Sequence, residues 1–309
     1  MNTRSPHTAT VLSLVMAVLA VSSSAPLIAF AAAPALAVAF WRTGLATVAL
    51  TPISLGPRRG ELRRVVRRRD ALLFCVLAGI ALAAHFATWM PSVQLGSVAT
   101  ATALVATQPV WQGLIAAAQG RRPSPAGWVG ISLAVAGTAW ATGVDVSVSG
   151  RAVLSDVLAL LGGIAVAVYT ALGERARAEL STTTYTWICY GTCAILLLAV
   201  CLIGHVSLGG YDKHTWLAIL AIVAGAQLLG HSMFNYALHR APATTVSVLA
   251  LLEVPGATLI AWVWLGQRPH LAALPGLVVL LLGVAVVVLG NRAQASPAPG
   301  PASPGESSR

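Results

Sequence analysis

The chain has 309 residues, of which 57% are hydrophobic and only 9% are charged, with a formal net charge of +10. Soluble globular proteins carry roughly 25% charged residues, so this composition excludes a water-soluble fold and predicts a multi-pass protein surrounded by lipid bilayer. The positive charge does not indicate nucleic-acid binding, because the arginines lie between the apolar runs.

Long apolar runs follow one another along most of the chain. About 20 mostly apolar residues in a helix are needed to cross the hydrocarbon core of a bilayer. We therefore predict an all-α integral membrane protein with ten transmembrane helices. The runs cover residues 10–32, 34–55, 70–91, 95–118, 125–144, 152–173, 183–205, 214–238, 242–265 and 271–290.

Arginine is distributed unevenly over the connections between these runs. If the N-terminal segment 1–9 is cytoplasmic, the outer connections contain only Arg151, Lys213 and Arg268, whereas residues 58–69 alone hold a cluster of arginines on the inner side. This is the bias of the positive-inside rule, and it predicts a cell-membrane protein with both termini in the cytoplasm. The tail 291–309 is dominated by Pro, Gly, Ala and Ser after its first residues, and we predict that it is disordered.

The two halves of the chain repeat each other without a gap at an offset of 146 positions. His85 then corresponds to His231, Pro109 to Pro255, Arg122-Pro123 to Arg268-Pro269, and Gly130 and Gly137 to Gly276 and Gly283, which we interpret as helix-packing or dimer contacts. We predict a first repeat at 10–144 and a second at 152–290. Each holds five spans, an odd number, so the second repeat enters the membrane from the opposite side, as inverted repeats of secondary transporters do.

Ionisable side chains within the spans are candidate site residues, because each is costly in a bilayer. Glu253 lies about midway along the ninth span, where its carboxyl must be protonated or paired. It is a candidate proton carrier, with a structural hydrogen bond as the equal alternative. Arg42 is a candidate for binding a substrate carboxylate. It could instead extend to the outer headgroups beside Trp41 or pair with an acid on another helix.

Further polar residues in the spans are candidates for the same site. His85 and His231 occupy equivalent positions in the two repeats, Gln108 precedes Pro109, and Asn235 follows His231 by one turn. Histidine titrates near physiological pH, and buried amides line polar cavities; the simpler interpretation is that these groups only join helices by hydrogen bonds. Candidate cavity-wall aromatics, which could equally be interfacial anchors, are Trp89, Trp111, Tyr169 and Trp187.

The sequence offers no sign of ATP-driven or metal-dependent chemistry. It contains no phosphate-binding loop of the GxxxxGK[ST] type, no cluster with metal-ligand spacing and no nucleophile elbow. We therefore expect no cofactor and no metal. The expected partners are a small-molecule solute, with protons as a candidate coupling ion, and the chain is expected to be a monomer or a homodimer. The alternative is an integral-membrane lipid-modifying enzyme, which would need a cluster of acids or a metal at one membrane face.

Over residues 10–290 the chain resembles the drug/metabolite transporter superfamily, and within it the EamA-like ten-helix permeases. The resemblance is carried by the inverted five-plus-five arrangement, the Trp41-Arg42 pair, and Pro109 and Pro255 in the fourth and ninth spans. It implies secondary transport of amino acids, other small metabolites or drugs, usually outward. The sequence departs from the family pattern where Gln267 stands in place of the usual glutamate, and where Glu253 is separated from Pro255 by one residue instead of preceding it directly.

Overall fold

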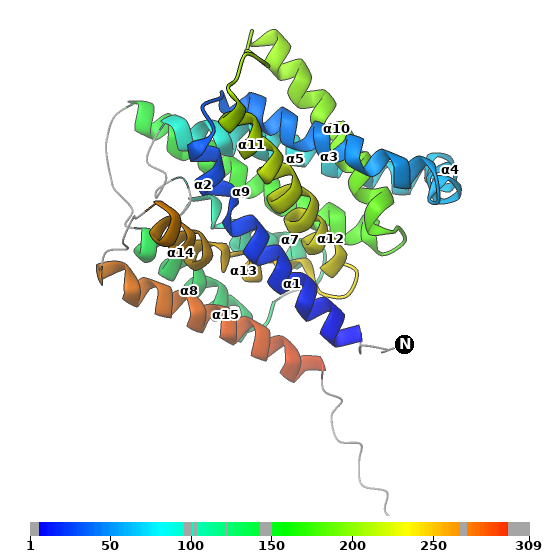
Figure 1. The fold of residues 1–309 in the computed structure, drawn as a ribbon. Coiled ribbons are helices and arrows are strands. Elements are labelled where there is room, and N and C mark those ends of the chain that lie inside the picture. The colour runs from blue at the N-terminus through cyan, green and yellow to red at the C-terminus, as the bar shows by residue number, and fades with distance from the viewer. Residues whose placement is uncertain are drawn as a thin grey trace, which may run out of the picture.

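The computed structural model describes residues 6–95, 101, 104–121, 123–142, 150–265 and 271–295, and throughout these ranges the regular structure is helical (Figure 1). The helices, in chain order, are α1 Pro6–Ser22, α2 Ser24–Phe30, α3 Ala35–Leu55, α4 Arg59–Arg67, α5 Arg69–Leu95, α7 Gln108–Ala118, α8 Pro125–Thr142, α9 Gly150–Arg177, α10 Thr182–Ile203, α11 Lys213–Ile222, the π-helix η1 Val223–His231, α12 Ser232–Ala237, α13 Ala243–Ala250, α14 Glu253–Leu265, the 3-10 turn η2 Leu271–Ala273, and α15 Leu274–Ala295.

Seven helical stretches of the described chain are long and apolar enough to cross a membrane, which confirms a multi-pass helical membrane protein. Of the three other predicted spans, 95–118 and 125–144 run into residues outside the described ranges, and α7 within the first of them has 11 residues. The third, 271–290, lies within the described ranges, but its apolar helical stretch Leu274–Val287 is shorter than the seven. The count of ten spans therefore remains a prediction. The seven stretches are Ala9–Ile28, Ala35–Leu55, Arg69–Leu95, Gly150–Arg177, Thr182–Ile203, Lys213–Ala237 and Ala243–Trp264.

Several predicted spans are interrupted near their middles. The first is divided between α1 and α2 next to Ser23, and the ninth is divided between α13 and α14, which begins at Glu253. Pro26 and Pro255 lie in the first turn of the helix that follows each break. Proline lacks an N–H and is tolerated in a first turn, where that N–H would have no helical partner, so it favours a new helix start over a continuous span. The eighth span contains the π-helix η1 between α11 and α12.

The connections between the predicted spans differ in form, and the one at 58–69, predicted as a short loop, contains helix α4. Helix α2 ends at Phe30 and α3 begins at Ala35, so the link between the first two spans is short. The turn after α7 contains Gly120 at a φ of 79°, a left-handed conformation that glycine adopts without a steric cost. The corresponding turn predicted at Gly266-Gln267-Arg268-Pro269 lies outside the described residues.

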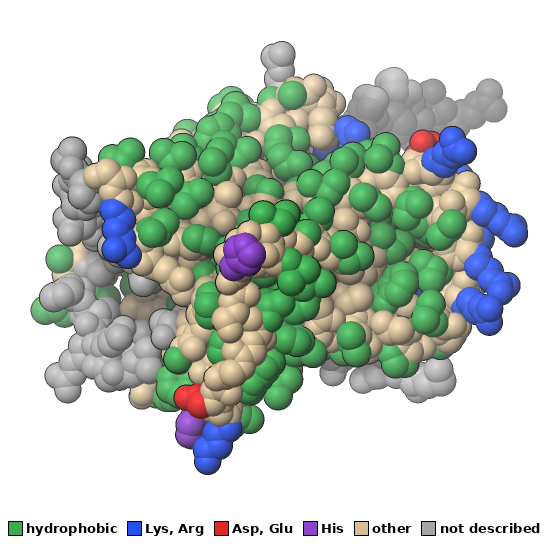
Figure 2. Space-filling view, turned by 90° about the horizontal axis from the view of Figure 1, so that it is seen from above, with side chains coloured by type: hydrophobic (Ala, Val, Ile, Leu, Met, Phe, Trp, Pro, Cys, Tyr) green, Lys and Arg blue, Asp and Glu red, His purple; other side chains and the backbone are tan. Residues whose placement is uncertain are grey.

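Apolar side chains form the core and also much of the outer surface. The largest buried cluster joins α3, α5, α9, α10 and the α11–η1 stretch, and a second cluster joins α8, α13, α14 and α15. Large apolar residues such as Ile195, Val263 and Leu217 are exposed on the outside. In Figure 2 hydrophobic side chains cover much of the visible face, while Lys and Arg gather at its edges, as expected for a surface in contact with lipid.

Helices α8 and α15 pack antiparallel along one side of the molecule (Figure 1). A Cβ atom placed on Gly130 would lie 2.9 Å from the carbonyl oxygen of Gly283, and one on Gly137 would lie 2.7 Å from the carbonyl oxygen of Gly276. Because Gly130 corresponds to Gly276 and Gly137 to Gly283, the contact is reciprocal. The glycines thus serve helix packing within the chain, one of the two uses predicted for them.

Candidate functional site

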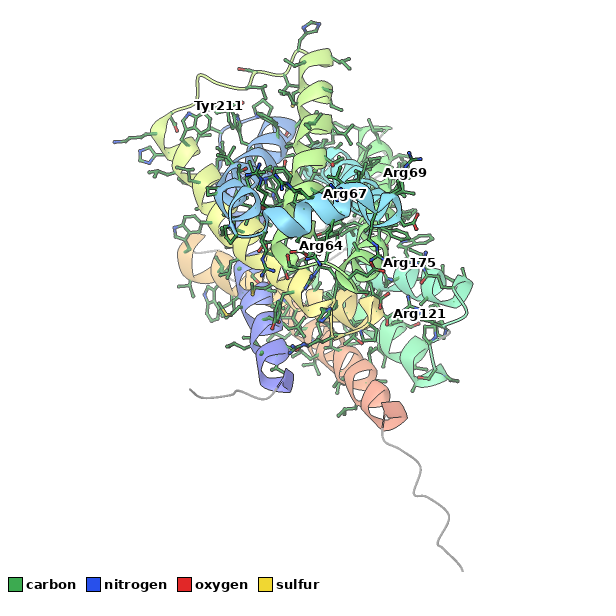
Figure 3. The ribbon with its side chains drawn as sticks, turned by 90° about the vertical axis from the view of Figure 1, so that its right-hand side faces the viewer. Arg64, Arg67, Arg69, Arg121, Arg175 and Tyr211 are labelled. Carbon is green, nitrogen blue, oxygen red and sulfur yellow. The ribbon has the colours of Figure 1, made fainter. Side chains whose placement is uncertain are left out.

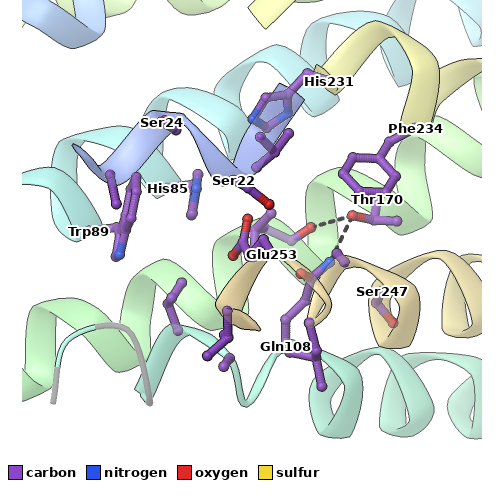
Figure 4. Close-up of a pocket in the computed structure, with 18 of the residues that line it drawn as sticks. Ser22, Ser24, His85, Trp89, Gln108, Thr170, His231, Phe234, Ser247 and Glu253 are labelled. Atoms are coloured by element: carbon purple, nitrogen blue, oxygen red, sulfur yellow. Dashed lines mark hydrogen bonds between the residues drawn. The ribbon is translucent and has the colours of Figure 1, made fainter. Parts of the chain in front are cut away.

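A cavity of about 470 Å³ lies where the interrupted helices meet (Figure 4). Its wall is formed by residues of α1, α2, α3, α5, α7, α9, η1, α12, α13 and α14, so both repeats predicted from the sequence contribute. Most of the wall is apolar. The cavity-lining residues include all the candidate substrate-binding residues, namely Arg42, His85, Gln108, His231, Asn235 and Glu253.

Two of the helix breaks place polar groups on this wall. Ser22 and Ser24 flank the break in the first span, and Glu253 lies in the first turn of α14. A carboxylate is stabilised at this end of a helix by the free N–H groups and the helix dipole. The two breaks also pack closely together, since a Cβ atom on Gly256 would lie 2.8 Å from Cβ of Ser22. Figure 4 shows Ser22 next to Glu253.

Arg42 on α3 is a buried cation with only 1% of its surface exposed. Its Nε donates a hydrogen bond of 2.8 Å to Oε1 of Gln227, and its guanidinium carbon lies 4.3 Å from the ring centre of Phe86. In the described chain it forms no ion pair with a carboxylate. The side chain therefore neither reaches the headgroups nor pairs with an acid on another helix, two of the alternatives that the sequence left open.

His85 and His231 belong to one aromatic cluster around Phe86. The ring centre of Phe86 lies 5.1 Å from that of His85 and 5.8 Å from that of His231. Nδ1 of His85 lies 2.9 Å from the carbonyl oxygen of Gly162, and because a carbonyl only accepts, this nitrogen carries the proton. Trp89 stacks on His85 at 5.6 Å with an interplanar angle of 6°. The equivalent histidines of the two repeats thus line one cavity.

Gln108 and Asn235 line the cavity and also connect helices. Nε2 of Gln108 donates to Oγ1 of Thr170 on α9 at 3.1 Å, as Figure 4 shows. Nδ2 of Asn235 donates to the hydroxyl of Tyr169, also on α9, at 2.6 Å. The helix-joining role that the sequence left open is therefore present for both amides, together with their position on the cavity wall.

The candidate wall aromatics separate into two pairs. Trp89 and Tyr169 line the cavity. Trp111 and Trp187 are not among the lining residues, and their indole N–H groups bond to threonines of the helix bundle. Trp111 donates to Oγ1 of Thr107 at 3.1 Å and Trp187 to Oγ1 of Thr51 at 3.0 Å.

Sequence reasoning missed several residues at this site. Gln227 holds Arg42 from within η1, Phe86 lies under the guanidinium, and Thr170 accepts from Gln108. A glutamine in the middle of the apolar run 214–238 is a visible signal, since a buried amide needs partners. Nothing in the sequence marks Phe86, because aromatic residues in apolar helices most often fill the core.

An ionic contact joins α9 to the turn after α7, at the end of the molecule that carries the arginines of α4, the arginine-rich end. Nη1 and Nη2 of Arg121, in the turn after α7, lie 3.0 Å and 2.7 Å from the two carboxylate oxygens of Glu174 on α9. The hydrogen bonds to Glu174 raise the pKa of Arg121 above its usual value. Glu174 also accepts from the N–H of Ala243 at 3.2 Å. Figure 3 labels Arg121 and Arg175 together with Arg64 and Arg67 of α4.

No group of three or more His, Cys, Asp or Glu side chains within the described ranges is arranged to hold a metal ion. The described residues on the cavity wall supply one cation, one carboxyl, two imidazoles, two amides and several hydroxyls.

Comparisons with known proteins agree with this arrangement. A model of the EamA-like transporter family matches residues 8–143 and again residues 153–289. A solved crystal structure with 22% sequence identity superposes with a TM-score of 0.75, covering 94% of this chain and 100% of the other, which shows a shared fold. No curated protein matches the sequence.

Proposed function

The chain belongs to the EamA-like transporter family of the drug/metabolite transporter superfamily, and from this premise we propose that it exports a small carboxylate-bearing solute, such as an amino acid, by alternating access. The membrane-transporter class follows from the family. The solute, the direction and the coupling are the proposal. We further propose a cell-membrane location with both termini in the cytoplasm, on the basis of the arginine bias.

The observation that carries the proposal is the buried guanidinium of Arg42 on the wall of the cavity. A buried cation is costly without an anion, and within the described chain no carboxylate lies within ion-pair distance of Arg42. Its Nε is occupied by Gln227, which leaves the two terminal nitrogens for a planar carboxylate. The cavity is of a size that suits a small solute.

Alternating access is supported by two helix contacts between the repeats that are equivalent under the internal duplication. Helix α5 packs on α9, and α1 packs on η1. Under the offset of 146 positions, α1 corresponds to α9 and α5 to the α11–η1 stretch, so each contact is the counterpart of the other. Together with the reciprocal glycines of α8 and α15, this is the pattern that a twofold axis in the membrane plane would produce.

Glu253 is the proposed proton carrier. It is an acidic group on the cavity wall, at the break between α13 and α14. A carboxyl in that position can take up a proton from one side and release it to the other as access alternates. We propose that proton entry through Glu253 drives the outward movement of the solute.

Flux into proteoliposomes tests the carboxylate site. We expect Arg42→Lys to weaken apparent affinity for carboxylate-bearing amino acids about 10–100-fold, because lysine cannot form the forked pair of charge-assisted hydrogen bonds. Arg177→Lys is the matched control, since Arg177 is also buried but donates to the backbone carbonyl of Asn235 and does not line the cavity. Equal affinities in the two variants would remove Arg42 from the site.

The coupling is tested with Glu253→Gln. We expect this variant to lose pH-gradient-driven flux while it retains exchange of solute across the membrane, because a glutamine cannot release a proton. Glu179→Gln is the control, since Glu179 is exposed and pairs with Arg68 at the arginine-rich end. Unchanged dependence on the pH gradient in Glu253→Gln would exclude Glu253 as the proton carrier.

A further inference from the structure

We propose that Gln227 is a positioning residue that fixes the guanidinium of Arg42 for carboxylate recognition; this inference rests on the proposed function. Gln227 is 0% exposed and lies in the π-helix η1. Its Oε1 accepts the hydrogen bond from Nε of Arg42 at 2.8 Å. Arginine only donates, so this contact fixes which end of the amide faces Arg42.

The orientation of the guanidinium is defined from two directions. Gln227 holds the Nε edge, and the ring of Phe86 lies against the flat face at 4.3 Å from the guanidinium carbon. When a planar group is held at one edge and on one face, the direction of its remaining edge is fixed. That edge carries the two terminal nitrogens, whose spacing matches the two oxygens of a carboxylate.

The backbone of Gln227 is itself anchored. Its carbonyl oxygen accepts from the hydroxyl of Tyr190 on α10 at 3.4 Å and from Oγ of Ser232 at 3.5 Å. A π-helix has a wider turn than an α-helix and commonly occurs at functional sites. Here the π-helical segment places a polar side chain from the middle of an apolar span against Arg42, which comes from another helix.

This arrangement occurs once in the chain although the halves are related. Under the 146-residue offset Arg42 corresponds to Ile188 and Gln227 to Ala81. The hydrogen bond between Arg42 and Gln227 therefore joins the first repeat to the second and has no counterpart. A contact needed only for helix packing would be expected in both repeats. A single solute site, in contrast, needs only one oriented cation.

Gln227 also retains unused hydrogen-bonding capacity. Its Nε2 is buried and has no hydrogen-bond partner within the described chain. Leaving a buried donor unpaired is unfavourable, so a packing role alone gives no reason for an amide here. An apolar side chain of the same shape would fill the space without that cost. The amide is instead explained by its oxygen Oε1, which accepts the hydrogen bond from Nε of Arg42.

The test measures binding of three probes to the purified full-length protein through the fluorescence of Trp89, which lines the cavity. The probes are L-leucine, 4-methylpentanoate, which keeps only the carboxylate, and leucinamide, which keeps only the amine. We expect Gln227→Met to weaken binding of the two carboxylates about tenfold and to leave leucinamide unchanged. Trp89→Phe in the wild-type background identifies the part of the signal that comes from this tryptophan.

Two further variants separate orientation from stability. Gln227→Glu keeps the acceptor but places a negative charge beside Arg42, so we expect a greater loss of carboxylate binding than in Gln227→Met. Gln112→Met is the matched control, because Gln112 is also a buried glutamine with an unpartnered amide atom, yet it does not line the cavity. It should leave the binding of all three probes unchanged.

The possible failures are distinguishable. If the wild-type protein binds neither carboxylate probe, the carboxylate site of the proposed function is contradicted, and with it the role of Gln227. If the wild type binds both carboxylates, and Gln227→Met and Gln227→Glu each bind them as tightly as the wild type does, only the positioning role is contradicted. An equal loss for leucinamide and the carboxylates would also contradict it, because it would show general damage to the cavity.

Discussion

The crossing of α8 and α15 gives a quantitative prediction for Gly137→Ala. A methyl group there would lie 2.7 Å from the carbonyl oxygen of Gly276, which is backbone and cannot move aside as a side chain can. Overpacking of this kind costs about 1–3 kcal/mol. The control is Gly127→Ala in the same helix, where the nearest atoms to the added methyl lie 3.4 Å away on Pro123 and Ser124.

The comparison of the two variants isolates the steric term. Both replace a helical glycine by alanine, which favours a helix interior by roughly 1 kcal/mol and favours the first turn, where Gly127 lies, by no more than that. A lower thermal midpoint for Gly137→Ala than for Gly127→Ala therefore reports the clash. With about 2–4 °C for each kcal/mol, the value for domains of roughly 150–250 residues, Gly137→Ala should unfold up to about 12 °C below Gly127→Ala.

The assay is thermal unfolding of detergent-purified protein at one fixed scan rate, since membrane proteins often unfold irreversibly. Gly130→Ala, whose methyl would lie 2.9 Å from the carbonyl oxygen of Gly283, should behave like Gly137→Ala because the contact is reciprocal. Equal midpoints for all three variants would refute the close approach of α8 and α15.

Two more predictions concern the arginine-rich end. Glu174→Gln should loosen the contact with Arg121 and raise the labelling rate of a cysteine placed in the cavity on the side of Arg121. Labelling from the other side should stay unchanged or fall, and unaltered rates on both sides would show that the contact does not restrain access. Burial raises the pKa of Glu61, but hydrogen bonds from the N–H and hydroxyl of Ser181 outweigh it, so its folded pKa lies below the ordinary 4.5. The stability this carboxylate contributes is therefore complete above about pH 4.5 and is lost as pH falls through the lower folded value. Glu61→Gln should lower the thermal midpoint at pH 7 by a small amount that shrinks below pH 4.5, and a constant difference at all pH values would contradict this.

The sequence was sufficient to predict the class of fold because lipid imposes strong requirements. Apolar runs of span length have few alternatives to a membrane helix, and the equivalence of His85 with His231 and of Pro109 with Pro255 indicated the duplication. What the runs did not predict was their interruption. The breaks near Ser23 and before Glu253 depend on how helices from both halves pack around a cavity, and proline alone marks only a local preference.

The site was predictable to a different extent for each type of residue. Charged and polar groups such as Arg42, Glu253 and Asn235 were recognisable because lipid does not tolerate them without a reason. Their partners were not, because Phe86 and Tyr190 look like ordinary core residues in the sequence. Trp111 and Trp187 were candidates for the cavity wall but do not line the cavity. The sequence places an aromatic residue in a span, and only the fold determines whether its ring faces a cavity.

The reciprocal glycines of α8 and α15 bear on how such a chain could arise. Two identical five-helix subunits inserted in opposite directions would meet through the same crossing, with each glycine of one facing the other glycine of its twin. Fusion of two such genes would leave the halves free to diverge, and a cation such as Arg42 would then need to be kept on one of them only.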